Sequence, residues 1–171
     1  TYLYFSGYLK HFPSVPDHDD RDRLFMSKGH SGTALLAVLG HAGYFPLKEL
    51  EDFNSNESRF GNNPDETIPG NEIHTGSLGH GLSLGAGHAF AFHLDDRSSR
   101  TYVLLSDGEC HEGSTWEGFM FAGHHKLKNL IVFIDRNGQC CEDFIEDCLK
   151  LEPFDDKLKS FGWNVFTVDG H

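Results

Sequence analysis

The chain has 171 residues, with 14 Lys and Arg against 26 Asp and Glu, and therefore a formal net charge of −12 at pH 7. So acidic a chain repels a phosphate backbone, and no lysine or arginine cluster stands out, so nucleic acid is not an expected partner. A hydrophobic fraction of 38%, with 15 Phe, excludes a disordered acidic tail and predicts one folded domain. The longest apolar run, residues 130–134, is far shorter than the roughly 20 residues of a membrane span, so we expect no membrane segment.

The cysteines bear on the cellular compartment of this domain, and the two chain ends bear on its expected extent. Cys110, Cys140, Cys141 and Cys148 lack the C-x-x-C spacing of zinc ribbons, and the adjacent pair is poorly placed to form a disulfide. A reducing, cytoplasmic setting fits best, and the first residues do not resemble a signal peptide. The chain has no initiator Met and stops just after an apolar run, so we expect a domain that spans residues 1–171 and is incomplete at both ends.

The first half of the chain predicts helices and a long loop. Residues 31–39 and 78–94 are small-residue-rich stretches of helical length, which indicates closely packed, buried helices. Apolar residues that follow Pro46 predict a short amphipathic helix with the proline near its first turn. Residues 54–69 contain the turn formers Asn62-Asn63-Pro64 and are expected to form a loop.

The second half alternates between strand-like and helix-like segments. Residues 102–105, 130–134 and 163–168 are short apolar runs, as expected for buried parallel strands. Residues 112–126 and 153–161 have helical spacing and lie between these runs. The order strand, helix, strand, helix, strand predicts an α/β domain with a mostly parallel sheet, flanking helices and right-handed crossovers.

Polar residues follow the first two of these strands. Asp107-Gly108 comes directly after one strand and Asn137 after the next, and the carboxyl ends of parallel strands meet at one ligand-binding edge. Asp107, Asn137 and a loop carbonyl near Gln139 are hard oxygen ligands, which suit Mg²⁺ or Ca²⁺. Gly108 allows close approach of a phosphate, and the helix that begins near Glu112 offers unpaired N–H groups. The edge is therefore a candidate site for a metal and a phosphorylated ligand.

Several segments together resemble the transketolase family in the right order. The run Ser106-Asp107-Gly108-Glu109-Cys110-His111-Glu112-Gly113, with Asp135-Arg136-Asn137 further on, looks like that family's thiamine diphosphate motif. The other matching segments are Ser27-Lys28-Gly29-His30, Pro69-Gly70, Thr75-Gly76-Ser77-Leu78-Gly79-His80-Gly81, Trp116-Glu117, Phe161-Gly162-Trp163 and Asp169-Gly170-His171. The resemblance covers the chain from about residue 20 to its end.

The resemblance implies a fold, an activity and partners. The expected fold is the three-layer thiamine diphosphate-binding α/β fold. The expected enzyme is a transferase that moves a two-carbon ketol unit from a ketose donor to an aldehyde acceptor, with thiamine diphosphate and Mg²⁺ or Ca²⁺ as cofactors. A sugar or sugar-phosphate substrate is implied, as is a pyrimidine-binding domain or C-terminal subunit of the same enzyme, in an assembly with two-fold symmetry.

The resemblance also implies roles for particular residues. Asp107, Asn137 and the main-chain carbonyl of Gln139 match the positions that hold the metal, and Gly108 matches the diphosphate contact. Glu109 belongs to the same motif and is expected among the cofactor-binding residues.

Two further residues are implied to be both catalytic and close to the cofactor. His30 matches a histidine near the thiazolium and the substrate. Glu112 matches a buried carboxylate at the subunit interface, beside the activating glutamate of the other chain. Gly76 and Leu78 match the loop that packs around the cofactor.

Departures from the family pattern leave other functions open. Ser106 replaces the glycine that begins the motif, and Asn63 stands where transketolases usually have a substrate-contacting histidine. A related acyloin-forming condensation, of the deoxyxylulose-phosphate synthase type, is one alternative. Another is a cofactor-domain homologue without catalysis, although the intact Asp107, Glu112 and Asn137 argue against it.

Simpler explanations exist for single motifs. An Asp-Gly pair after a strand is usually only a turn, and a lone His30 or His80 usually caps or packs a helix. For His30 the longer matching segment favours a functional role, whereas His80 stays equally open. None of the twelve histidines has the H-E-x-x-H or Cys/His spacing of a zinc site.

Overall fold

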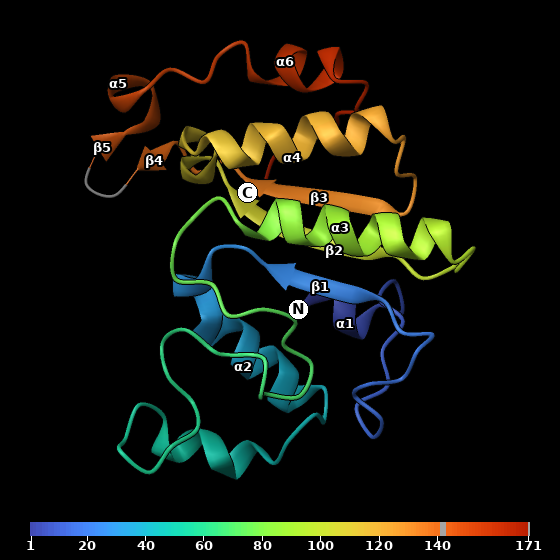
Figure 1. The fold of residues 1–171 in the computed structure, drawn as a ribbon. Helices are drawn as coiled ribbons and strands as arrows, with labels where there is room; N and C mark the ends of the chain where they lie inside the picture. Colours follow the sequence, from blue (N-terminus) through green and yellow to red (C-terminus); the bar gives the residue numbers. More distant parts are fainter. Residues whose placement is uncertain (141–142, 171) are drawn as a thin grey trace.

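A three-stranded parallel sheet lies at the centre of the computed structural model, which describes residues 1–140 and 143–170. Its strands are β1 (Arg23–Met26), β2 (Thr101–Ser106) and β3 (Leu130–Asp135), and they lie in that order. Tyr102 is opposite Leu24 on one side and Ile131 on the other. Because the strands are parallel, their carboxyl ends all lie at one edge, to which the arrows of β1 and β3 point in Figure 1.

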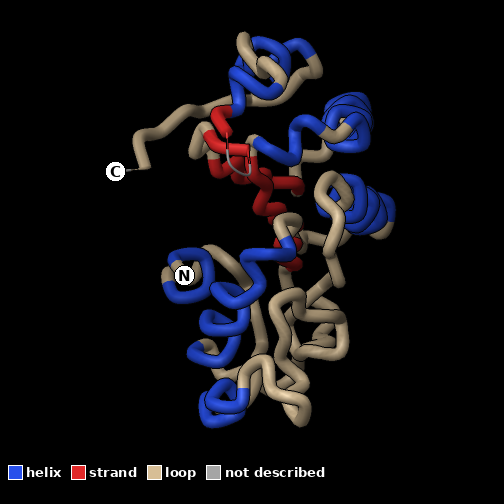
Figure 2. Tube along the Cα trace, turned by 90° about the vertical axis from the view of Figure 1, so that its left-hand side faces the viewer, coloured by secondary structure: helices blue, strands red, loops and turns tan. Residues whose placement is uncertain are grey.

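One face of the sheet is covered by α3 (Gly81–Leu94) and α4 (Gly113–His124), as Figure 2 shows from the side. Side chains alternate between the faces of a strand, and Phe25, Val103 and Leu105 belong to the core cluster on this side. All three are at most 1% exposed. They pack with buried residues of the two helices, among them Leu82 and Phe119.

The opposite face is covered by α2 (Gly32–His41) and the short α1 (Tyr2–Phe5). Leu24 and Tyr102, whose side chains point the other way from Phe25 and Val103, form a second core cluster with Leu36 and Leu39 of α2. Helices therefore lie on both faces of a parallel sheet. The predicted three-layer α/β architecture is confirmed.

Short elements complete the chain, and they are η1 (Gly29–Ser31), η2 (Leu47–Asp52), η3 (Gly108–His111), β4 (Gln139–Cys140), β5 (Asp143–Phe144), α5 (Ile145–Cys148) and α6 (Phe154–Ser160). The helices predicted over residues 31–39, 78–94, 112–126 and 153–161 are confirmed within a few residues as α2, α3, α4 and α6. The predicted helix after Pro46 is the 3₁₀ helix η2, and residues 54–69 form turns and loop, as expected.

Two strand assignments differ from the prediction. The sequence did not indicate β1, because its four residues are too few for a clear apolar run and follow the charged stretch 19–22. The prediction of a strand over residues 163–168 is wrong, since this stretch forms no ladder with the sheet. Trp163 and Val165 pack against the core, while Phe166 and Val168 are 86% and 83% exposed. Alternating burial without backbone pairing does not make a strand.

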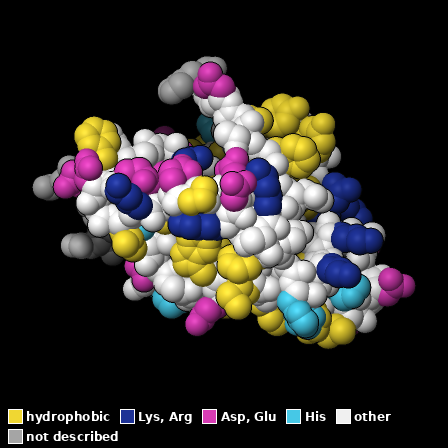
Figure 3. Space-filling view, turned by 90° about the horizontal axis from the view of Figure 1, so that it is seen from above, with side chains coloured by type: hydrophobic (Ala, Val, Ile, Leu, Met, Phe, Trp, Pro, Cys, Tyr) yellow, Lys and Arg dark blue, Asp and Glu magenta, His cyan; other side chains and the backbone are white. Residues whose placement is uncertain are grey.

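Two residues named in the sequence analysis fall outside the described residues, namely Cys141 of the cysteine pair and His171 of the last matching segment. Within the described part of the chain, no helix is long and apolar enough to cross a bilayer. The surface around α6 has acidic, basic and hydrophobic side chains interspersed (Figure 3), as on an ordinary solvated face.

Candidate functional site

The carboxyl edge of the sheet gathers the polar residues that the motifs singled out. Asp107 follows β2 directly, and its backbone N–H donates to the carbonyl of Asp135 at the end of β3 over 3.1 Å. Asn137 follows two residues later in the chain. The predicted meeting of the two strand ends at one edge is therefore confirmed.

The Asp107 carboxylate is held rigidly at this edge. The residue is 1% exposed, and its Oδ1 accepts a hydrogen bond from the N–H of Gly108 at 2.9 Å. Its Oδ2 accepts one from the N–H of Gly138, in the loop after β3, at 2.8 Å. A carboxylate has about four lone-pair sites, so both oxygens keep acceptor capacity toward a cation.

The other proposed metal ligands lie in the loop that Asp107 anchors. Asn137 Oδ1 accepts a hydrogen bond from the N–H of Gln139 at 2.9 Å, which closes a tight turn. A Cβ placed on Gly108 would lie 3.9 Å from both the Gln139 carbonyl oxygen and Ser106 Oγ, which is an ordinary contact distance, so this carbonyl lies beside Gly108. A cavity of about 240 Å³ adjoins Asp107 and Gly138.

The donor set fits a hard cation. Within the residues that the structure describes, no three His, Cys, Asp or Glu side chains cluster as metal ligands. The set at this edge is instead a carboxylate, a carboxamide and a main-chain carbonyl, all of them oxygen donors. Such half-sets suit Mg²⁺ or Ca²⁺ when ligand phosphates and water complete the coordination.

Glu109 lies inside the protein rather than on the surface of the site. Its exposure is 0%, and its Oε1 accepts hydrogen bonds from Ser27 Oγ at 2.5 Å and from the N–H of Gly79 at 3.1 Å. Its Oε2 accepts from the N–H of Ser106 at 3.2 Å. The carboxylate therefore contacts three segments of the chain.

The glycine-rich loop packs against the start of α4. Gly79 has a φ of +85°, a conformation that favours glycine, and an added Cβ would lie 2.6 Å from the Cβ of Glu112. Ser114 Oγ donates to the Gly79 carbonyl at 2.8 Å. Gly76 is exposed and Leu78 half-buried. Within this chain Glu112 is exposed, so its expected burial at a subunit interface stays a prediction.

His30 is exposed in η1, between two loops. An added Cβ on Gly29 would overlap the Thr75 carbonyl oxygen at 1.7 Å, and one on Gly32 would lie 2.1 Å from Pro64 Cδ. The turn that carries His30 is therefore wedged between the segments that carry Gly76 and the exposed Asn63. These three segments lie side by side, and we call their exposed residues His30, Gly76 and Asn63 the rim of the site.

His80 has a simpler place in the fold. It occupies the N-cap position of α3, and its side chain makes no capping hydrogen bond. The residue is exposed beside the glycine-rich loop.

Some residues at this edge had no role in the sequence analysis. Lys28 Nζ donates to Asp135 Oδ2 at 2.5 Å, and the Lys28 side chain is only 13% exposed. This ion pair joins the ends of β1 and β3 across β2. The segments that resemble the family contain Ser27, Lys28 and Asp135, so the sequence could have pointed to these positions. It could not show which side chains they contact.

Cys110 lies under the site and is 1% exposed. Burial raises the pKa of its thiol to about 12, and the neighbouring Glu109 and Asp107 carboxylates act in the same direction. The thiol therefore stays protonated at neutral pH, which excludes a thiolate nucleophile at this position.

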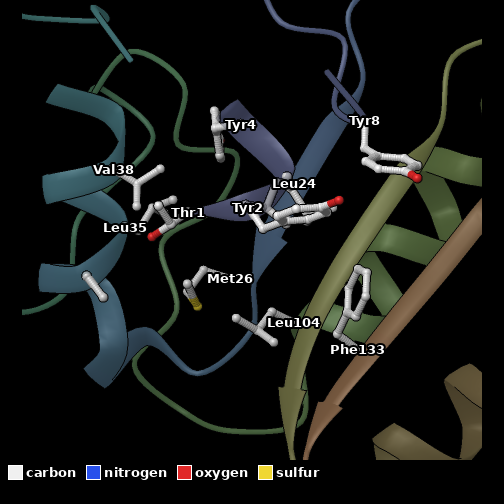
Figure 4. A pocket seen from close by; sticks show the side chains of 12 residues that line it. Thr1, Tyr2, Tyr4, Tyr8, Leu24, Met26, Leu35, Val38, Leu104 and Phe133 are labelled. Carbon is white, nitrogen blue, oxygen red and sulfur yellow. The ribbon is translucent and has the colours of Figure 1, made fainter. Parts of the chain in front are cut away.

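A larger cavity, of about 560 Å³, lies on the α2 side of the sheet and not at its carboxyl edge. Figure 4 shows tyrosine rings of the N-terminal segment facing Leu24, Met26 and Leu104 of the strands and Leu35 and Val38 of α2. Among the described residues, no charged side chain lines it. An apolar space without convergent charged groups does not fit a diphosphate.

Comparison with known proteins gives the same family throughout. The family model described as "Transketolase, thiamine diphosphate binding domain" matches residues 1–171, so the chain belongs to the transketolase family. A 6-deoxy-6-sulfo-D-fructose transketolase subunit, SqwG, from Clostridium sp. (strain MSTE9) is 40% identical over 170 residues, which are 99% of this chain and 62% of that protein. One of the subunits of an apulose-4-phosphate transketolase from Phocaeicola vulgatus is 38% identical, over 99% of this chain and 60% of its own length.

Solved structures agree with this result. The transketolase of Campylobacter jejuni superposes with a TM-score of 0.86 at 32% identity, over 93% of this chain and 26% of that one. A transketolase mutant from Pichia stipitis gives 0.87 at 32% identity, over 96% and 26%. The chain thus spans about three fifths of the two curated relatives and about a quarter of these two structures.

Proposed function

Because this chain belongs to the transketolase family and matches its thiamine diphosphate-binding domain, we propose that it is the diphosphate-binding half of a ketol-transferring enzyme. The enzyme would move a two-carbon unit from a ketose donor to an aldehyde acceptor. One observation carries the proposal most directly. Asp107 is fixed by two backbone N–H groups beside Gly108 and the Gln139 carbonyl, at the carboxyl edge of a parallel sheet.

A divalent cation would be held by Asp107, Asn137 and the Gln139 carbonyl. A carboxylate alone repels a diphosphate, so a cation between them is needed to bring the two together. Gly108 would let the backbone approach the phosphate groups closely, since it has no side chain of its own. Mg²⁺ or Ca²⁺ suits these oxygen ligands.

Thiamine diphosphate, when bound, supplies a carbanion that adds to the ketose carbonyl and a place for the electrons of the broken carbon–carbon bond. This chain's residues would bind, orient and shield. His30, on the exposed rim, would donate a hydrogen bond to substrate oxygen or move a proton there. The loop of Gly76 and Leu78 would exclude water, and Glu112 would face the partner polypeptide.

The partner and the substrate belong to this proposal too. The two relatives are named as subunits, which supports a separate chain that carries the pyrimidine-binding face. Their names specify a sulfonated and a phosphorylated sugar, which supports a ketose with an anionic group as the substrate class. With a net charge of −12 on this chain, we expect the cations for that group on the partner. The cysteine pattern supports a cytoplasmic location.

The test is calorimetry on the complete enzyme, with its partner chain, titrated with thiamine diphosphate. We expect binding in Mg²⁺ and a loss of roughly 100-fold or more in affinity both in excess chelator and in Asp107→Ala, since a direct metal ligand matters at least as much as its neighbours. Asp156→Ala, on the exposed side of α6, is the matched control and should bind as wild type does.

Two outcomes would contradict the proposal at different points. Equal affinity with and without Mg²⁺ would end the metal assignment at Asp107. Absence of thiamine diphosphate binding by the wild-type enzyme in Mg²⁺ would end the proposed function itself.

A further inference from the structure

A buried carboxylate joins the three chain segments on which the proposed site depends. Ser27 begins the segment that leads into His30, Gly79 ends the loop that contains Gly76 and Leu78, and Ser106 directly precedes Asp107. Glu109 accepts a hydrogen bond from each of these segments, at 2.5, 3.1 and 3.2 Å respectively. Ser27 and Gly79 are 82 and 30 positions from Glu109 along the chain, so the fold brings them to it, whereas Ser106 is only three positions away.

The hydrogen-bond directions at Glu109 are fully determined by its neighbours. The N–H groups of Gly79 and Ser106 can only donate. Ser27 Oγ accepts a hydrogen bond from the N–H of Gly81 at 3.1 Å, which leaves its own hydrogen to point at Glu109. Three donors thus converge on one side chain that is 0% exposed, an arrangement that an acceptor-only carboxylate satisfies.

The backbone of Glu109 is held as well. Its carbonyl accepts a hydrogen bond from Thr115 Oγ1 at 2.8 Å, and Thr115 is 0% exposed in the first turn of α4. The carboxylate therefore extends from a fixed point between β2 and α4. Because its backbone is fixed, Glu109 cannot follow its hydrogen-bond partners if they shift.

We propose that Glu109 is a positioning residue, which sets the relative placement of the His30 turn, the Gly76–Leu78 loop and Asp107 without touching cofactor or substrate. This inference rests on the proposed function, because those three segments are its cofactor-binding parts. Misplacement of site groups by about 1 Å can cost two orders of magnitude in rate. The charge of Glu109 acts through its three donors.

Glu109→Gln separates this role from packing. The two side chains have nearly the same shape, so the core keeps its volume. An amide has only one acceptor oxygen, so its NH₂ group must face either the Ser106 N–H or the pair of donors at Ser27 and Gly79. All three donors lose their charged acceptor, and at least one segment loses its hydrogen bond altogether and moves away. Loss of a hydrogen bond to a charged group changes an equilibrium constant by about tenfold or more.

The experiment measures the Kd for thiamine diphosphate in Mg²⁺ by calorimetry, on the complete enzyme and well below its unfolding midpoint. We expect Glu109→Gln to weaken binding about tenfold or more. Ser27→Ala should act in the same direction, and the double variant should be no weaker than the stronger single one, because both disturb one network. Leu158→Ala, a core truncation in α6, supplies a destabilised protein whose site network is intact.

The outcomes divide clearly. Weaker binding in Glu109→Gln with near wild-type binding in Leu158→Ala supports a positioning role. Wild-type affinity in Glu109→Gln, or equal weakening in Leu158→Ala, overturns it and leaves Glu109 as a core residue only. If Glu109→Gln does not fold, wild-type affinity in Ser27→Ala overturns the proposal and weaker binding supports it. A wild-type enzyme that binds no thiamine diphosphate overturns the proposed function, which is a separate result.

Discussion

Asp107 and Glu109 are neighbouring carboxylates with different surroundings. Burial of a charged group is unfavourable unless hydrogen bonds compensate, and each of these side chains receives two or three from the protein. The three donors around Glu109 come from three segments of the chain, and its side chain is fully buried. Those of Asp107 are two backbone N–H groups, and Asp107 lines a cavity of about 240 Å³. The first arrangement suits holding the fold, and the second suits holding a ligand.

At the residue scale, His30 is predicted to affect turnover rather than cofactor binding. It is exposed, and its expected contacts are near the reacting carbon rather than the diphosphate, so His30→Ala should leave the Kd for thiamine diphosphate largely unchanged. General acid–base groups contribute roughly 100-fold or more, and we expect kcat and kcat/KM to fall together by about that factor.

Steady-state kinetics with calorimetry on the same samples checks this prediction. His41→Ala, which removes an exposed histidine at the end of α2, is the control and should be unaffected. An unchanged kcat in His30→Ala would return His30 to a packing or capping role.

Among the elements, α3 lies unusually close to the sheet. Gly85 faces Val103 of β2, which is 0% exposed, and the two elements touch where neither has room for another carbon atom. The small residues predicted to pack this helix closely do so at Gly85 and Ala86. Since α3 begins at Gly81, whose N–H donates to Ser27 Oγ, this contact also sets how far the start of α3 lies from the carboxyl ends of the strands.

Gly85→Ala is predicted to destabilise the protein although alanine favours helices. The gain in helix propensity is about 1 kcal/mol at most. The new Cβ would lie 2.5 Å from Val103 Cγ2, and overpacking of a filled core costs about 1–3 kcal/mol, so the steric effect wins. Urea unfolding should show a lower midpoint with an unchanged slope.

A double variant tests the cause. Val103→Ala removes the methyl group that Gly85→Ala would strike, and alone it should cost about 2 kcal/mol. We expect the double variant to be more stable than the sum of the single effects by about 1 kcal/mol or more. Simple additivity would mean that the contact between Gly85 and Val103 does not limit this position.

At the scale of the whole molecule, the outer sides of α3 and α4 remain partly apolar. Leu84, Met120 and Phe121 are 48%, 54% and 39% exposed. Phe119 and Trp116 of α4 are respectively buried and half-buried in the core cluster and do not belong to this exposed face. An exposed apolar face of this kind is typical of a surface that another polypeptide covers.

We therefore predict that this chain by itself does not turn over ketose and binds thiamine diphosphate weakly. The pyrimidine-binding face has no counterpart among the motifs of this chain, so activity should appear only when the partner is added, in an assembly with two of each face. Light scattering after size-exclusion chromatography, with a turnover assay on each fraction, measures both properties. A lone monomer that turns over ketose would rule out the shared site.

The sequence by itself determined the elements and residues that depend on local pattern. The apolar runs of β2 and β3 and the spacing of α3 and α4 were readable, and the parallel order of the strands was enough to place Asp107 and Asn137 at one edge. These features follow from neighbours within a few residues. No comparable local signal marked β1, which is short and preceded by charges.

Only the tertiary structure decided which side chains meet. Residues 163–168 look like a strand but have no ladder, because pairing requires a partner's backbone and not merely apolar alternation. The sequence named Glu109 among the expected cofactor-binding residues, but it could not show that donors from Ser27, Gly79 and Ser106 enclose the side chain. Hydrogen bonds between segments this far apart depend on atomic positions within a few tenths of an ångström, and a one-dimensional pattern carries no such information.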